Sequence, residues 1–335
     1  MNTKILAIDP EKIEPDAIVQ AARILWNGGL VAFPTETVYG LGANALDAAA
    51  VARIFAAKGR PSSNPLIVHL HEASEARKVV AAWPTAANRL AERFWPGPLT
   101  LVLPKRPEVP DIVTAGAPTV AVRVPAHPVA LALLRSVGWP LAAPSANRSS
   151  ELSPTRAEHV LRSLGGRIEL ILDAGPTTGG IESTVLDLTR QLPRLLRPGL
   201  IRPAELEAIL GPIERTSDIQ AVESRALPSP GMLSRHYAPR TPLECVEVDA
   251  SERVEQLLAQ GLHVGWVTFS PARAAAAPGL VYVPMPEDPA GYAAQLYAVL
   301  HQLDDAGLDR LVVSLPPDTE AWAAIRDRLR RAAHL

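Results

Sequence analysis

The sequence is poor in cysteine and in aromatic residues. Of 335 residues, one is cysteine, Cys245, and 4% are aromatic. A single cysteine excludes a disulfide within the chain and every zinc site that is built on several thiolates. Cys245 lies in the strand-like stretch LECVEV, and we interpret it as a small apolar strand residue.

Long apolar runs and a strong charge of one sign are also missing. No run of about 18 apolar residues occurs, so the sequence predicts no membrane-spanning helix. Residues 1–16 carry acids early and lack an apolar core, so we expect no signal peptide and a cytoplasmic protein. The formal net charge of −2 excludes a positive potential over the whole surface that would attract polyanions. A local basic groove is still compatible with this net charge.

Common nucleotide-binding and hydrolase motifs are absent. The chain contains neither G-x-x-x-x-G-K-[ST] nor G-x-S-x-G, which argues against a P-loop protein and an α/β-hydrolase. Residues 40–45, GLGANA, match G-x-G-x-x-A, but PTETVY separates them from the preceding strand and no acid follows at the expected distance. A dinucleotide site is therefore disfavoured. His69 and His71 are two residues apart on a predicted strand, so they would share one face. They could bind a metal ion together, but the sequence favours a single functional imidazole.

The first 211 residues mix strands and helices without regular alternation, which predicts a twisted sheet of mixed direction. Hydrophobic periodicity and capping residues predict helices over 14–27, 47–58, 85–94, 127–136, 153–163 and 202–210. Short apolar runs predict strands over 30–33, 66–70, 99–103, 120–124, 140–144, 170–173 and 183–188.

The pattern changes near residue 211. Residues 212–242 have no sustained period and several breakers, so we predict a functional linker or lid. From residue 243 onward apolar strands alternate with helices, which predicts a smaller, mostly parallel, three-layer α/β domain. We expect an N-terminal domain over 1–211 and a C-terminal domain over 243–335.

Polar residues follow a buried strand at residues 31–42, VAFPTETVYGLG. Thr35, Glu36 and Thr37 come directly after the strand, and we interpret Gly40 and Gly42 as a glycine-rich turn. α/β sheets bind ligands at the carboxyl ends of their strands. The stretch therefore predicts a ligand site near Thr35.

Cations and hydroxyls also occur at the predicted ends of other elements in the first domain. They are Lys58, Arg60, Arg123, Ser145, Asn147, Ser183 and Arg197. Such a set favours a phosphorylated ligand and catalysis by positioning and charge neutralisation. The alternatives are helix capping by Lys58 and Arg60 and an edge strand on which Arg123 faces water.

Six ordered blocks of the sequence resemble the YrdC-like family. They are FPTETVYGLG, KGRPSSNPL, WPGPLT, AVRVPAHP, PSAN and ESTV, and residues 229–242 resemble the linker of its two-domain members. The resemblance implies a YrdC-like twisted mixed sheet with a concave cleft. It also implies a nucleotidyltransferase that makes L-threonylcarbamoyl-AMP from L-threonine, bicarbonate or CO₂, and ATP. Pyrophosphate is released, and the product serves the modification of tRNA beside the anticodon.

The resemblance assigns roles to individual residues. Four residues resemble the signature tetrad of the family and are therefore implied to be catalytic: Lys58, Arg60, Ser145 and Asn147. L-threonine would be bound by Thr35, His69, Arg123, Ala143 and Ser183. ATP would be bound by Lys58, Ser62, Asn64, Thr119, Ser145, Ser153, Arg197, His236 and Tyr237. Mg²⁺ would bridge the ATP phosphates without protein side chains, His236 and Tyr237 would fold over the nucleotide, and a separate threonylcarbamoyl transferase would take the product.

Two other functions are alternatives to the synthase. One is a module that binds double-stranded RNA or tRNA; the net charge of −2 argues against strong salt-dependent affinity but leaves weak binding open. The other is a carbamoyl-AMP-forming enzyme, similar to domains of hydrogenase maturation proteins. Those proteins carry a zinc-finger region, and no CxxC pattern exists here.

Overall fold

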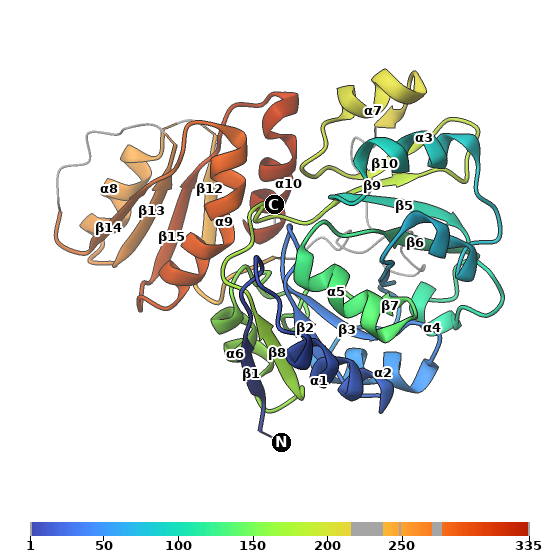
Figure 1. Cartoon of the computed structure of the whole chain (residues 1–335). Coiled ribbons are helices and arrows are strands. Elements are labelled where there is room, and N and C mark those ends of the chain that lie inside the picture. The colour runs from blue at the N-terminus through green and yellow to red at the C-terminus, as the bar shows by residue number, and fades with distance from the viewer. Residues whose placement is uncertain (1, 216–236, 248, 270–276, 334–335) are drawn as a thin grey trace.

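The computed structural model describes residues 2–215, 237–247, 249–269 and 277–333. Within these ranges the chain forms two β-sheets, each covered by helices (Figure 1). None of the described helices is long and apolar enough to cross a membrane.

The first sheet has eleven strands in the order β1-β8-β2-β3-β7-β4-β6-β5-β9-β10-β11. Parallel pairs such as β1 and β8 alternate with antiparallel pairs such as β2 and β3, which confirms the mixed sheet. The strands are β1 (Lys4–Ala7), β2 (Val31–Phe33), β3 (Gly40–Asn44), β4 (Ile67–His69), β5 (Leu99–Pro104), β6 (Thr119–Arg123), β7 (Leu141–Ala142), β8 (Leu170–Asp173), β9 (Thr184–Asp187), β10 (Arg194–Arg197) and β11 (Glu214–Arg215).

Helices cover both faces of this sheet because its strands bury side chains on both sides. Helices α1 and α5 pack over Val31 and Leu170, while Ala32 and Leu41 belong to the core of the other face. The helices are α1 (Pro15–Trp26), α2 (Ala48–Lys58), α3 (Thr85–Phe94), α4 (Asp111–Thr114), α5 (Pro128–Val137), α6 (Ala157–Leu164), α7 (Pro203–Leu210) and the 3₁₀ helix η1 (Ala73–Lys78).

Two local predictions were wrong. Gly40 and Gly42 lie in strand β3 rather than in a turn. A Cβ on Gly42 would stand 2.8 Å from the Phe33 ring, so the missing side chain makes room for Phe33 of the paired strand β2. Helix α6 begins at Ala157 rather than at 153, because the Ser153 hydroxyl donates to Glu182 and does not cap the helix.

The predicted linker begins as part of the first sheet. Strand β11 pairs in parallel with β10, so residues 214–215 extend the sheet edge. Residues 216–236, which include His236, lie outside the described part of the chain.

The second sheet is parallel throughout, which confirms the mostly parallel three-layer prediction. Its order is β12-β15-β13-β14. Val264 and Trp266 pack with helix α8 on one face, whereas Val267 packs with α9 and α10 on the other. The elements are β12 (Leu243–Val246), α8 (Ser251–Ala259), β13 (Val264–Thr268), β14 (Leu280–Pro284), α9 (Pro289–Asp304), β15 (Arg310–Ser314), η2 (Glu320–Trp322) and α10 (Ala323–Ala333).

The two sheets meet through helices α9 and α10, which face the first domain (Figure 1). Ile181 of the first domain shares an apolar cluster with Leu296 of α9. Gly180, with φ +73°, lies so close to α9 that a Cβ would stand 2.1 Å from the Ala293 carbonyl oxygen. The rings of His159 and His301 stack across the same junction with their centroids 3.8 Å apart.

We expect Gly180→Ala to destabilise the protein by about 1–3 kcal/mol more than Gly28→Ala, because the new methyl group overpacks the domain junction. Gly28 has the same φ of +73° but open space around it, so it controls for the backbone strain. Urea unfolding of both variants measures the difference, and equal losses would contradict the close approach.

The stacked histidines predict acid sensitivity. Burial lowers the pKa of His159 to about 3 and that of His301 to about 4. The unfolded chain therefore binds more protons below pH 6.5, and stability falls by about 1.4 kcal/mol per pH unit for each histidine as the pH decreases toward the folded pKa. Unfolding midpoints between pH 7 and 5 should change less steeply in His301→Gln than in the wild type. Identical slopes would refute this origin.

Candidate active site

A pocket opens where several strands of the first sheet end. It contains about 520 Å³ of space free of protein atoms, part of it open to solvent. Its walls come from the loop after β2, the turn after α2, and the ends of β4, β6, β7 and β10, with the segments before β9 and after residue 236. The lining residues are Thr35, Thr37, Val38, Gly40, Arg60, Ile67, His69, Arg123, Ala143, Pro144, Ser145, Glu182, Ser183, Arg197 and Tyr237.

The pocket brings together most of the residues singled out from the sequence. All five candidates for threonine binding line it: Thr35, His69, Arg123, Ala143 and Ser183. Four further candidates line it as well: Arg60, Ser145, Arg197 and Tyr237.

The polar loop after β2 is organised by one hydroxyl. Thr35 Oγ1 donates to the Val38 carbonyl at 2.6 Å and accepts from the amides of Thr37 at 3.1 Å and Val38 at 3.2 Å. The Thr37 hydroxyl lies 2.8 Å from it. This Ser/Thr turn gives the loop a defined shape at the pocket wall.

Arg123 is buried, so the alternative of an edge strand facing water is wrong. Its side chain is 4% exposed, and Nη2 donates to Glu36 Oε1 at 2.6 Å. Nη1 donates to Thr37 Oγ1 at 3.0 Å and Nε to the Gly97 carbonyl at 3.2 Å. These contacts fix the plane of the guanidinium at the pocket wall.

Arg60 and Arg197 add positive charge to the pocket. Arg60 Nε donates to the Asn64 carbonyl at 3.0 Å and Nη2 to the Pro65 carbonyl at 2.8 Å. Burial, reinforced by Arg197 and opposed by Tyr237, lowers the pKa of Arg60 to about 9. Arg197 Nε donates to the Ser183 carbonyl at 3.1 Å. Two neighbouring buried cations favour an anionic ligand between them.

The tetrad predicted from the sequence is split between the wall and the layer behind it. Lys58 Nζ donates to the carbonyls of Ser145, at 2.5 Å, and Asn147. Burial, with the nearby Arg60, lowers the pKa of Lys58 well below its usual value, while Glu151 opposes the shift. Lys58 thus holds the 145–147 segment from behind, and Arg60 and Ser145 face the pocket.

Four further candidates for nucleotide binding do not belong to the described pocket lining: Ser62, Asn64, Thr119 and Ser153. Asn64 is fully buried, and its side-chain amide has no hydrogen-bond partner among the described residues. Ser62 is exposed on the turn after α2, and Thr119 begins β6 at the end opposite Arg123.

Glu182 lines the pocket but was not among the residues predicted from the sequence. Glu182 accepts from Ser153 Oγ at 2.5 Å, from Arg328 Nε at 2.8 Å and from the Tyr297 hydroxyl at 3.2 Å. Burial alone raises its pKa, but Arg328 and Arg197 outweigh burial and hold the pKa below its usual value. The sequence did contain a signal for this residue, because Glu182 is the carboxylate directly before Ser183 in the ESTV block.

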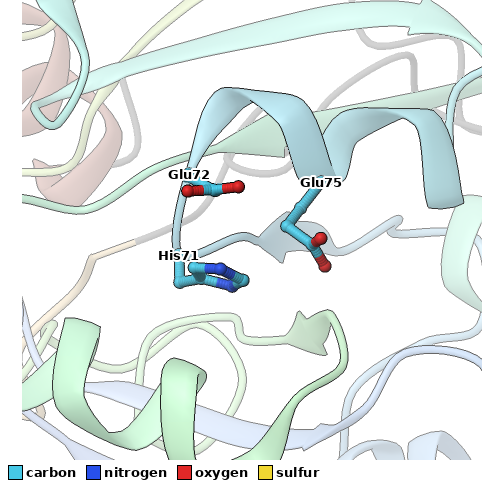
Figure 2. Close-up of side chains that lie close together, drawn as sticks. All are labelled: His71, Glu72 and Glu75. Atoms are coloured by element: carbon cyan, nitrogen blue, oxygen red, sulfur yellow. The ribbon is translucent and has the colours of Figure 1, made fainter.

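The two candidate histidines do not share a strand face as predicted. Strand β4 ends at His69, and burial, reinforced by Arg123, lowers the pKa of His69 to about 3. His69 is therefore a neutral imidazole in the pocket. His71 lies beyond the strand and points toward Glu72 and Glu75 (Figure 2), and Glu75 is paired with Lys78.

Fold and site together define an α/β protein with a pocket lined by buried arginines, a setting that favours an anionic ligand. The chain belongs to the Sua5/YciO/YrdC family, because residues 23–199 match its model, which is described as telomere recombination. Residues 201–334 match the model described as the C-terminal domain of threonylcarbamoyl-AMP synthase. These matches confirm the resemblance seen in the sequence.

Named relatives cover nearly the whole chain. It is 45% identical over 324 residues to the threonylcarbamoyl-AMP synthase of Bacillus subtilis (strain 168), covering 94% of this chain and 92% of the relative. It is 42% identical over 330 residues to that of Pyrococcus abyssi, covering 96% of each. The crystal structure of P. abyssi Sua5 complexed with L-threonine matches with a TM-score of 0.92 and 42% identity, covering 99% of this chain and 98% of that one. Escherichia coli YciO matches 59% of this chain and 96% of its own, with a TM-score of 0.54 and 29% identity.

We expect Arg123→Met to lower the free energy of unfolding by about 3–5 kcal/mol, because it leaves the Glu36 carboxylate without its partner in a largely buried site. The matched control is Arg106→Met, whose partner Glu108 is exposed, and which should cost at most about 1 kcal/mol. Chemical denaturation measures both variants. A loss in Arg123→Met as small as in the control would contradict the buried ion pair.

Proposed function

We propose that this chain is an L-threonylcarbamoyl-AMP synthase that uses L-threonine, bicarbonate or CO₂, and ATP, and releases pyrophosphate. The observation that carries the proposal is the convergence of Thr35, His69, Arg123, Ala143 and Ser183 on one pocket with Arg60 and Arg197. Full-length similarity to proteins named for this activity supports it.

Arg123 is suited to hold the threonine carboxylate. Nη1 and Nη2 each use one N–H on Thr37 and Glu36, and each terminal nitrogen carries a second N–H. That pair can bind a carboxylate in a bidentate manner. Neutral His69 is suited to contact the threonine hydroxyl or the carbamate. The complex of P. abyssi Sua5 with L-threonine supports L-threonine as a ligand of this chain.

The reaction we propose is a nucleotidyl transfer. The neutral threonine amine attacks CO₂ and releases a proton to water, which gives a carbamate. A carbamate oxygen then attacks the α-phosphorus of ATP, and the bond between that phosphorus and the pyrophosphate leaving group breaks. Arg60 and Arg197 would neutralise the triphosphate, while Lys58 holds the 145–147 segment in place. The lining offers arginines rather than a set of metal ligands, so Mg²⁺ would enter on the ATP phosphates and supply further charge neutralisation.

The remaining assignments extend this proposal. Tyr237 lies at the pocket, which supports a lid formed by the linker, although His236 is outside the described residues. A lid would exclude water from a labile product. The product would pass to a threonylcarbamoyl transferase that acts on tRNA, in the cytoplasm. Weak RNA binding by this chain stays an open alternative.

Pyrophosphate release from ATP and bicarbonate should depend on added L-threonine. Lys58→Met should reduce the rate about 100-fold, because the 145–147 segment loses the donor that fixes it at the pocket wall, and a small misplacement of catalytic groups has effects of that size. The control Lys4→Met replaces an exposed lysine that contacts Gln20 and should leave the rate unchanged. Release that ignores threonine would refute the assigned substrate, and serine in place of threonine would test the pocket further.

A further inference from the structure

One arginine of the C-terminal domain reaches the pocket from behind. Arg328 lies on helix α10, and its side chain is 0% exposed. Nε donates to Glu182 Oε2 at 2.8 Å, and Nη1 donates to the Pro198 carbonyl at 2.9 Å. Pro198 directly follows Arg197, so Arg328 contacts the first domain at two places beside the cationic wall.

Glu182 connects Arg328 to the pocket, because it accepts a hydrogen bond from Arg328 and also lines the pocket. Its carboxylate also accepts from Ser153 Oγ at 2.5 Å and from Tyr297 of helix α9 at 3.2 Å. The guanidinium of Arg328 also lies 5.4 Å from the centre of the Tyr237 ring, within the range of a cation–π contact. Arg328 therefore contacts two lining residues, Glu182 and Tyr237.

Stabilising the junction between the domains does not by itself explain the buried ion pair between Arg328 and Glu182. Desolvation offsets much of the attraction in a buried ion pair, so apolar side chains of similar volume often stabilise as well. The junction already has such side chains, including Ile181 packed near Leu296 and Leu300. What the ion pair adds is a defined orientation for Glu182 and for the ring of Tyr237.

Most contacts of Arg328 point to the nucleotide side of the pocket, although Ser183, a threonine candidate, directly follows Glu182 and accepts from Arg197 Nη2 at 3.2 Å. Ser153 and Tyr237 are candidates for the nucleotide, and Arg197 is the cation next to Pro198. On the threonine side, Thr35, Glu36 and Arg123 form their own network, and no hydrogen bond described for them reaches Glu182 or Arg328. A change at Arg328 should therefore affect the two substrates unequally.

We propose that Arg328 is a positioning residue, through which the C-terminal domain orients Glu182 and Tyr237 for the nucleotide. This inference rests on the proposed function for the identity of the nucleotide, ATP. It gives the C-terminal domain a part in ATP binding, although that domain supplies no residue to the described pocket lining.

The test measures the binding of ATP and of L-threonine separately, by calorimetry on the full chain. Arg328→Met should raise the Kd for ATP about 10-fold or more, because hydrogen bonds to charged groups and their positioning have effects of this order. The Kd for L-threonine, measured without ATP, should change less than about 2-fold, within the usual effect of a distant substitution. Arg328→Lys, which keeps the charge but loses the planar fork, should fall between Arg328→Met and the wild type.

Two further variants add a control and a second test of the proposal. Arg330→Met changes a half-exposed arginine of the same helix, whose nearest acid is Glu247 at 3.7 Å, and should leave both affinities unchanged. Tyr297→Phe removes one hydrogen bond to Glu182 without opening a large cavity and should raise the Kd for ATP by about 2- to 5-fold. If Arg328→Met does not fold, Tyr297→Phe and Arg328→Lys decide the question.

An unchanged Kd for ATP in folded Arg328→Met would overturn the inference. So would a parallel loss of both affinities together with a lower unfolding midpoint, because that pattern indicates structural support alone. Both binding measurements are independent of turnover. A wild type that binds ATP and L-threonine but releases no threonine-dependent pyrophosphate would refute the proposed function, and a selective loss of ATP affinity would still support the role of Arg328.

Discussion

The structure depends on how it accommodates buried positive charge around one pocket. Lys58, Arg60, Arg123 and Arg197 are all buried, and desolvation of each cation is costly unless donors find acceptors. Backbone carbonyls at the ends of strands and turns meet much of this requirement for Lys58, Arg60 and Arg197. Glu36 supplies a carboxylate for Arg123. The cations thereby keep fixed positions, and their charge favours an anionic ligand in the pocket.

The same constraint explains how the second domain is joined to the first. Glu182 is buried next to the pocket, and its charge is balanced by Arg328 from helix α10. The domains also share an apolar cluster around Ile181 and meet closely at Gly180. The junction thus combines apolar packing, which is not directional, with an ion pair whose geometry is directional. Only the second component can orient a pocket residue.

Prediction from the sequence succeeded where the determinants are local. Asp47 caps helix α2, its side chain accepting from the amides of Ala49 and Ala50, and Gly59 ends the helix in a left-handed conformation; both were readable from the sequence. Prediction failed at Gly40 and Gly42, because turn propensity was assigned to residues whose conformation is set by pairing with β2. The helix start at Ser153 was wrong for a similar reason, since Glu182, 29 residues away, takes the serine hydroxyl.

The sequence by itself determined the family, the mixed and parallel sheets, and the residue types that line the pocket, because ordered motifs and hydrophobic periodicity are local properties of the chain. Only the tertiary structure decided which of these residues face the pocket and which, as Lys58 and Asn147, support it from behind. It also decided that Arg123 is buried and that Arg328 reaches Glu182, 146 residues away. Side-chain burial and ion pairing across domains depend on the packing of distant segments, and no local pattern in the sequence specifies that packing.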